Sequence, residues 1–83
     1  MATVALVAIE IDVHSGVPSY QQLAAILRAQ IAEGELSSDD LVPSESQLER
    51  THRVSRVTVR KAIEVLRNED LVYTLPQRGT YVR

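Results

Sequence analysis

A capped helix, a second helix a few residues further on and a β-hairpin directly after it predict an α+β fold of the winged helix-turn-helix type. Ser44 and Gln47 mark the first of these helices, and an apolar stripe within residues 54–67 marks the second. Turn residues between two strand-like stretches, 71–75 and 80–82, mark the hairpin. With one more helix upstream, we expect three helices and a two-stranded wing, with a possible extra strand at the N-terminus. The 83 residues form one small core that buries roughly 60% of the unfolded chain's surface.

The N-terminal stretch from Val4 to His14 has the pattern of a strand. Ile9, Ile11 and Val13 alternate with polar residues, and the stretch before them is nearly all apolar. We therefore assign residues 1–17 to an N-terminal strand or arm and residues 18–83 to the main domain. An exposed edge of such a strand is the feature that would pair two copies tightly without a further partner.

The first predicted helix covers about residues 19–33. Ser19 and Gln22 have the spacing of a capping box, and Gly34 is placed to end the helix. Its apolar residues recur at helical spacing along one side: Tyr20, Leu23, Ala24, Ile26, Leu27 and Ile31. A polar loop is expected over residues 36–43, from which Leu41 or Val42 can turn inward.

The next two helices are joined tightly. A second capping box, Ser44 with Gln47, opens a short helix that ends near Thr51 or His52. Ser55 then caps a helix to Arg67, in which a buried stripe faces the core: Val59, Ala62, Ile63 and Leu66. This spacing predicts a helix-turn-helix.

The opposite side of the helix at 55–67 suits a DNA major groove. It carries Val57, Arg60, Lys61 and Glu64, with Arg56 and Thr58 beside them. Arginine can bond guanine through two parallel hydrogen bonds, and a Val or Thr methyl can meet the thymine methyl. The alternative is a solvated basic face on an ordinary surface helix.

The hairpin places Gln77 and Arg78 at its tip, within the turn from Pro76 to Gly79. A hairpin directly after a helix-turn-helix is the order of a winged helix. Its tip can follow a phosphate strand or enter a minor groove, where the negative potential attracts arginine. The alternative for Arg78 is a solvated hairpin tip.

Charge is distributed unevenly along the chain, although the net charge is only −2. Residues 1–49 hold eight acidic residues and one cation, whereas residues 50–83 hold eight cations and three acidic residues. Because salt screens charges beyond about 8–10 Å, a basic face on an acidic protein is compatible with binding a polyanion. Chance clustering and charge complementation at helix ends are the alternative.

Composition argues against several other classes of function. The chain has no cysteine, and its two histidines lie far apart without ligand spacing, so we expect no metal and no cofactor. No nucleophile and base lie near His52, which argues against an enzyme. The apolar N-terminus lacks a basic start and is shorter than a membrane span, so we expect a cytoplasmic protein and no membrane partner.

Four segments together resemble the N-terminal winged-helix domain of GntR-type bacterial transcription regulators. They are PSYQQLAAILRAQIAEGEL, VPSESQL, VSRVTVRKAIEVLRNEDLV and QRGTYV, in that order between residues 18 and 82. The start at Pro18 to Leu23 is most similar to the HutC/YtrA-like branch. The resemblance implies a sequence-specific, DNA-binding transcription regulator, a repressor, with the recognition helix in the major groove of a two-fold symmetric operator.

The resemblance also implies which residues contact DNA. The family's pattern is kept at Ser55, Arg56, Thr58 and Arg60, whereas Ser46 stands where the family often has an arginine. Gln77 replaces a glycine in the wing, and Asp70 stands where glycine commonly ends the third helix. The full set of candidate DNA-binding residues is Ser44, Ser46, Arg53, Ser55, Arg56, Val57, Thr58, Arg60, Lys61, Gln77, Arg78 and Gly79.

Family members usually carry a C-terminal domain that binds a small effector and supplies most of the dimer contact. We therefore expect no effector pocket within residues 1–83 and a homodimer that is weak or forms only on DNA. A winged helix used for protein interaction is the alternative function. Arginines at a helix start together with Arg78 at a wing tip favour DNA over an acidic protein partner. The helix and the wing can each enter a groove of a duplex, whereas an acidic protein surface would not require cations on both elements.

Overall fold

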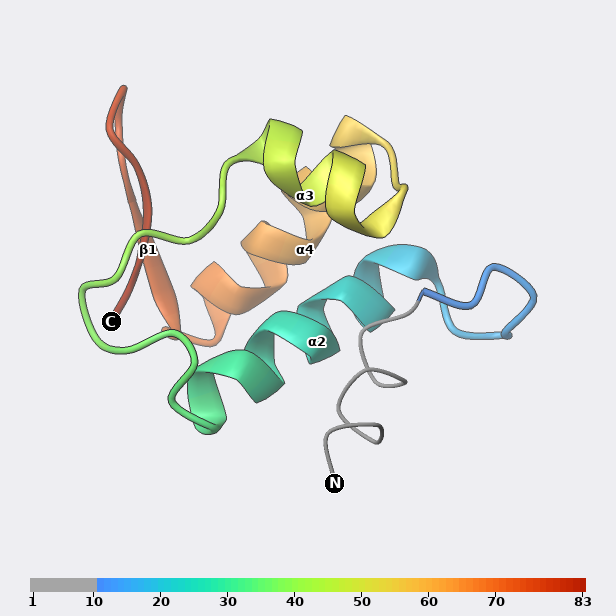
Figure 1. Ribbon diagram of the computed structural model, residues 1–83, viewed down its shortest axis with the longest axis horizontal. Coiled ribbons are helices and arrows are strands. Elements are labelled where there is room, and N and C mark those ends of the chain that lie inside the picture. The colour runs from blue at the N-terminus through green and yellow to red at the C-terminus, as the bar shows by residue number, and fades with distance from the viewer. Residues whose placement is uncertain (1–10) are drawn as a thin grey trace.

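The computed structural model describes residues 11–83, which form three helices followed by a hairpin (Figure 1). The helices are α2 (Ser19–Ala32), α3 (Glu45–His52) and α4 (Arg56–Asn68), and the strands are β1 (Val72–Leu75) and β2 (Gly79–Val82). This order confirms the predicted winged helix-turn-helix. Within the described residues, none of the helices has the length and apolar character needed to cross a bilayer.

The strand predicted at Val4 to His14 is wrong over its described part. Residues 4–10 lie outside the described residues, and residues 11–14 enter a turn instead. The amide of Ser15 donates to the carbonyl of Asp12 at 3.2 Å, and Val13 is 72% exposed. The turn that leads to α2 therefore determines the backbone here, although apolar and polar residues alternate as in a strand.

The capping box predicted at Ser19 and Gln22 is also wrong. Pro18 is the N-cap of α2 and provides no side-chain cap. The Gln22 side chain turns back to the preceding segment, where its amide donates to the carbonyls of Asp12 at 2.9 Å and Val17 at 2.8 Å. Its Oε1 accepts from the Asp12 amide at 2.8 Å. Contacts to residues five and ten positions away outcompete the local cap.

The other predicted helix ends agree with the structure. Ser44 and Gln47 form the complete capping box of α3, and the Ser55 hydroxyl accepts from the Thr58 amide at 3.1 Å at the start of α4. The connecting turn has a left-handed residue, Arg53, with φ 55°. Gly34 ends α2 with φ 84°, as its position predicted.

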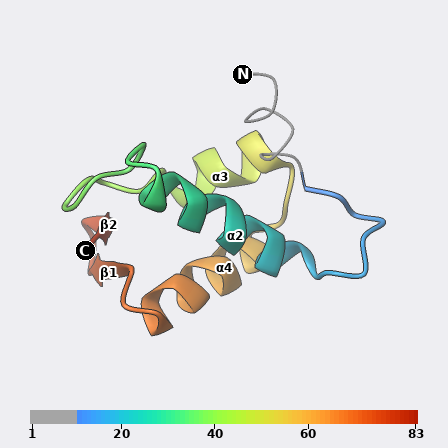
Figure 2. The same ribbon diagram turned by 90° about the horizontal axis from the view of Figure 1, so that it is seen from below.

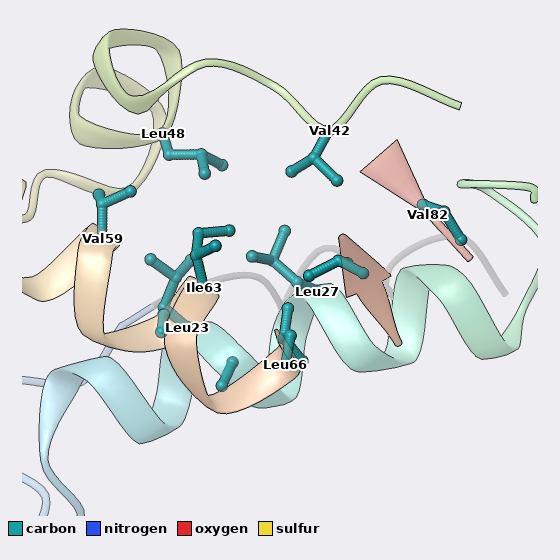
Figure 3. Packing of buried hydrophobic residues seen from close by; sticks show 11 residues of the cluster. Leu23, Leu27, Val42, Leu48, Val59, Ile63, Leu66 and Val82 are labelled. Atoms are coloured by element: carbon teal, nitrogen blue, oxygen red, sulfur yellow. The ribbon is translucent and has the colours of Figure 1, made fainter. Parts of the chain in front are cut away.

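The core lies where the three helices meet the base of the wing. α2 and α3 both pack against α4 (Figures 1 and 2). Every stripe residue predicted for α4 is buried, and Leu23, Val59 and Leu66 are completely buried. Figure 3 shows the cluster around Ile63, with side chains from α2, α3, α4, the loop before α3 and β2. The full cluster is Leu23, Ala24, Leu27, Val42, Leu48, Val59, Ala62, Ile63, Leu66, Val72 and Val82.

The loop before α3 forms part of the wing, which the sequence pattern did not indicate. β1 and β2 pair antiparallel, with Val72 opposite Val82 and Leu75 opposite Gly79. Residues 39–42 add a third, strand-like edge along β2, because the Val42 amide donates to Thr80 at 2.8 Å and the Val82 amide donates to Asp40 at 2.9 Å. Of the two residues considered for the interior, Val42 is 3% exposed and Leu41 is 57% exposed.

Three non-glycine residues around the wing have left-handed backbone: Asp39, with φ 68°, Asp70 and Gln77. Asp70, after α4, has φ 61°, a backbone conformation that favours glycine. Gln77 has φ 64° after Pro76, and the Arg78 amide donates to the carbonyl of Leu75 at 3.0 Å. Proline followed by a positive φ is typical of a type II turn. Gln77 at the wing tip thus adopts a left-handed backbone conformation that glycine adopts more easily.

Candidate nucleic-acid interface

An open groove of 780 Å³ separates the helix-turn-helix from the wing. Side chains of α3, α4, the loop before α3 and the hairpin line it, so elements distant in sequence share one face. Seven of the twelve candidate residues belong to its lining: Ser44, Val57, Arg60, Lys61, Gln77, Arg78 and Gly79. No sequence pattern predicted this groove, because its width depends on how the wing packs beside α4.

The remaining five candidates lie just beyond the groove. Ser46 is an exposed residue of α3, Arg53 is the exposed left-handed residue of the turn, and the other three stand at the start of α4: Ser55, Arg56 and Thr58. The structure therefore brings all twelve to the helix-turn-helix and the wing. Seven line the groove, four lie in the turn or at the start of α4, and Ser46 lies near the start of α3.

Ser55 and Thr58 are engaged with each other before any ligand is bound. The Ser55 hydroxyl accepts from the Thr58 amide at 3.1 Å and donates to the Thr58 hydroxyl at 3.1 Å. Ser44 is similarly engaged in the cap of α3. These hydroxyls stabilise the helix starts, and an N-cap of this kind contributes about 1 kcal/mol. Val57 beside them is 61% exposed, so its methyl groups are accessible to a partner.

Two glutamates of α3 face the arginines of α4, and sequence reasoning missed this feature. Arg60 Nε lies 3.0 Å from Glu45 Oε2, and its Nη2 lies 3.5 Å from Glu45 Oε1. Arg56 Nε lies 3.9 Å from Glu45 and 3.6 Å from Glu49. Residues fifteen positions apart meet only because the turn folds α3 across α4, so no local pattern could have shown the contact. Both arginines remain more than 60% exposed.

The other cations of α4 contact neighbouring elements. The Lys61 ammonium lies 5.7 Å from the ring centre of Tyr20 on α2. Arg67 donates to the Thr74 hydroxyl on β1 at 3.1 Å. Each contact holds the aliphatic part of its side chain in place and keeps the positive charge at the rim of the groove.

Arg78 differs from these cations. Within residues 11–83, its guanidinium has neither a hydrogen-bond partner nor an ion-pair partner, and its side chain is exposed. The adjoining Gly79 has φ 128°, and a Cβ there would lie 2.8 Å from Leu41 Cδ1. The wing tip therefore presents an unconstrained arginine next to a position that only glycine fits.

The described residues give little support for metal binding or catalysis. No group of three or more His, Asp or Glu side chains among residues 11–83 is arranged to hold a metal ion. His52 Nδ1 is buried without a hydrogen-bond partner in this part of the chain, at the end of α3. The shifted pKa values belong to structural contacts: the Arg28 hydrogen bond lowers the pKa of Glu69, and the Asp39 hydrogen bond raises that of Tyr73.

A helix-turn-helix with an exposed, arginine-bearing second helix and a basic wing tip defines the class: a winged-helix DNA-binding domain. The model of the family "Bacterial regulatory proteins, gntR family" matches residues 19–82. The chain belongs to this family. Membership of a family of regulatory proteins confirms the prediction of a non-enzymatic, DNA-binding transcription regulator.

Known relatives agree in sequence and in fold. The chain is 43% identical over 72 residues to the transcriptional repressor NagR of Bacillus subtilis (strain 168), covering 87% of this chain and 30% of that protein. It resembles YtrA from Sulfolobus acidocaldarius, a GntR-family transcription factor, with a TM-score of 0.82, 34% identity and coverage of 92% and 80% of the two chains. The DNA-binding domain of AraR in complex with operator ORE1 gives a TM-score of 0.79, 34% identity and coverage of 81% and 82%. NagR and YtrA support the predicted HutC/YtrA-like branch.

Proposed function

We propose that this chain is the operator-binding part of a transcriptional repressor. In this proposal α4 enters the major groove, and the wing, residues 71–82, lies at the minor groove or along the phosphate backbone. The observation that carries it is the groove in which Arg60 on α4 and Arg78 at the wing tip line opposite sides. The AraR domain, solved in complex with its operators, supplies independent support.

The proposed contacts divide into two kinds. Arg56, Val57, Thr58 and Arg60 face outward from the first two turns of α4 and are the candidates for base edges. Backbone contacts are assigned to the candidates on α3, the turn and the wing: Ser44, Ser46, Arg53, Ser55, Lys61, Gln77, Arg78 and Gly79. Residues 18–83 form the DNA-binding unit and residues 1–17 an arm, whose described end is attached to α2 through Gln22.

Two copies are proposed to meet on an operator with an inverted repeat, weakly or only on DNA. NagR is a longer protein, and this chain spans 30% of its length. We therefore place effector binding and most dimer contact outside residues 1–83. Because the operator lies on the chromosome, we infer that the protein acts in the bacterial cytoplasm.

Selection from randomised duplex DNA tests this function. Binding of the chain to a randomised duplex pool is followed by fluorescence anisotropy. The bound duplexes are then separated from the free ones and sequenced. We expect an inverted repeat of short half-sites. An enriched pool without any half-site would refute the regulator and favour the protein-interaction alternative.

Sedimentation velocity tests the assembly. At micromolar concentration the free chain should sediment as a monomer or weak dimer, and adding the selected duplex should give a complex with two copies. A tight dimer without DNA would contradict the DNA-dependent dimer.

A further inference from the structure

Glu45 holds the guanidinium of Arg60 by one edge. Its two carboxylate oxygens lie 3.0 Å from Nε and 3.5 Å from Nη2. A guanidinium has five N–H donors, so this pair leaves the edge formed by Nη1 and the second hydrogen of Nη2 available. That edge can still bond a guanine through two parallel hydrogen bonds. The glutamate therefore orients Arg60 without blocking its base-reading side.

The same carboxylate affects two classes of DNA contact differently. A phosphate oxygen that approaches Arg60 is negatively charged and also approaches Glu45, so the carboxylate repels it. The edge of guanine is neutral and presents acceptors, so it experiences much less repulsion. Arg56 is subject to the same effect, since Glu45 and Glu49 lie within 3.9 Å and 3.6 Å of its Nε.

The pair is weak enough to respond to DNA. The side chains of Arg60 and Glu45 are 63% and 45% exposed, and ion pairs this exposed contribute little to folding stability. Removing the carboxylate charge should therefore change how Arg60 meets DNA while leaving the fold intact.

We propose that Glu45 is a positioning residue that sets sequence specificity by restraining Arg60, and to a lesser extent Arg56, from phosphate contacts. This inference rests on the DNA-binding function proposed above. In non-cognate complexes the carboxylate weakens binding, because the arginines would otherwise bond to the backbone. In the cognate complex it remains on the Nε edge while the other edge of Arg60 bonds guanine. Discrimination then comes from repulsion of the wrong contact as well as from attraction to the right one.

The test compares Glu45→Gln with Glu64→Gln on the selected operator and on a scrambled duplex across a salt series. Glu64 is an exposed glutamate that lines the same groove and pairs with no cation among residues 11–83, so it controls for the loss of one negative charge. We expect E45Q to bind the scrambled duplex about two- to fivefold more tightly, with operator binding unchanged or weaker, so the specificity ratio falls. The slope of log K against log[salt] on the scrambled duplex should steepen by about one unit. E64Q should change both duplexes by one common factor.

A double-mutant cycle separates positioning from a general charge effect. In an Arg60→Ala background, E45Q should have lost most of its effect on the specificity ratio. The proposal is overturned if E45Q shifts both duplexes equally, if E64Q changes the ratio as much, or if the effect persists without Arg60. Failure of the wild-type chain to prefer any duplex would instead refute the DNA-binding function, so the two failures are distinguishable.

Discussion

Replacing Arg60 and Arg78 in turn distinguishes base reading from backbone positioning. In the proposed operator complex, Arg60 contacts guanine through two hydrogen bonds, and Arg60→Ala would remove this contact, which is worth ~1–3 kcal/mol. The pair that Arg60 forms with Glu45 is exposed and costs at most ~1 kcal/mol to disturb, so most of that loss should appear in binding. We expect operator affinity to fall by roughly 5- to 150-fold. The scrambled duplex, which lacks the guanine at this position, should lose far less.

Arg78→Ala should behave differently, because no described side chain fixes its guanidinium. A minor groove distinguishes mainly A·T from G·C, and a phosphate carries no sequence information. Both duplexes should therefore weaken by similar factors, and a phosphate contact would reduce the salt slope by about one unit. Fluorescence anisotropy of both variants on both duplexes across a salt series measures all these quantities. The reverse pattern, with Arg78 selective and Arg60 not, would refute the assignment of roles while leaving the fold unaffected.

Three further predictions concern the fold. Leu66→Ala, at a completely buried position, should lower the free energy of unfolding in urea by ~2–5 kcal/mol; a loss below ~1 kcal/mol would contradict the described core. Gly79→Ala should lower the free energy of unfolding by ~1–3 kcal/mol, because alanine adopts φ 128° only with strain; Gly16→Ala, with open space around it, is the control and should be neutral. The pKa of Glu69 is lowered by its hydrogen bond, so this contribution to stability is present above the unfolded-state pKa and is lost as pH falls through the folded-state value. In Glu69→Gln, the free energy of unfolding should change less with pH over this acidic range. An unchanged pH profile would argue against the ion pair.

Patterns within one element predicted most of the fold. Ser44 and Ser55 were recognised as helix caps because a cap depends on residues only three positions away. The buried side of α4 followed from helical periodicity, which tertiary packing rarely reverses over thirteen residues. The hairpin followed from Pro76 and Gly79 between two β-prone stretches.

Contacts between elements could not be predicted in the same way. The side chain of Gln22 was expected to cap α2, but hydrogen-bonding groups at Asp12 and Val17 offered it three partners. The strand-like segment at 39–42 contains two aspartates and no alternation, since its pairing with β2 depends on backbone groups. The contact of Glu45 with Arg60 required the angle between α3 and α4, which periodicity does not give.

The strand-like segment beside β2 also fixes where α3 begins relative to the wing. Val42 is hydrogen-bonded to the wing, and Ser44 caps α3, so Pro43 alone joins these two fixed points. Because proline holds φ near −65°, this joint is short and stiff. The place of α3 beside the wing therefore depends on the chain length at this joint. In the proposed operator complex, inserting a residue beside Pro43 would shift the backbone contacts of α3 relative to those of the wing, so an operator of altered spacing would be selected.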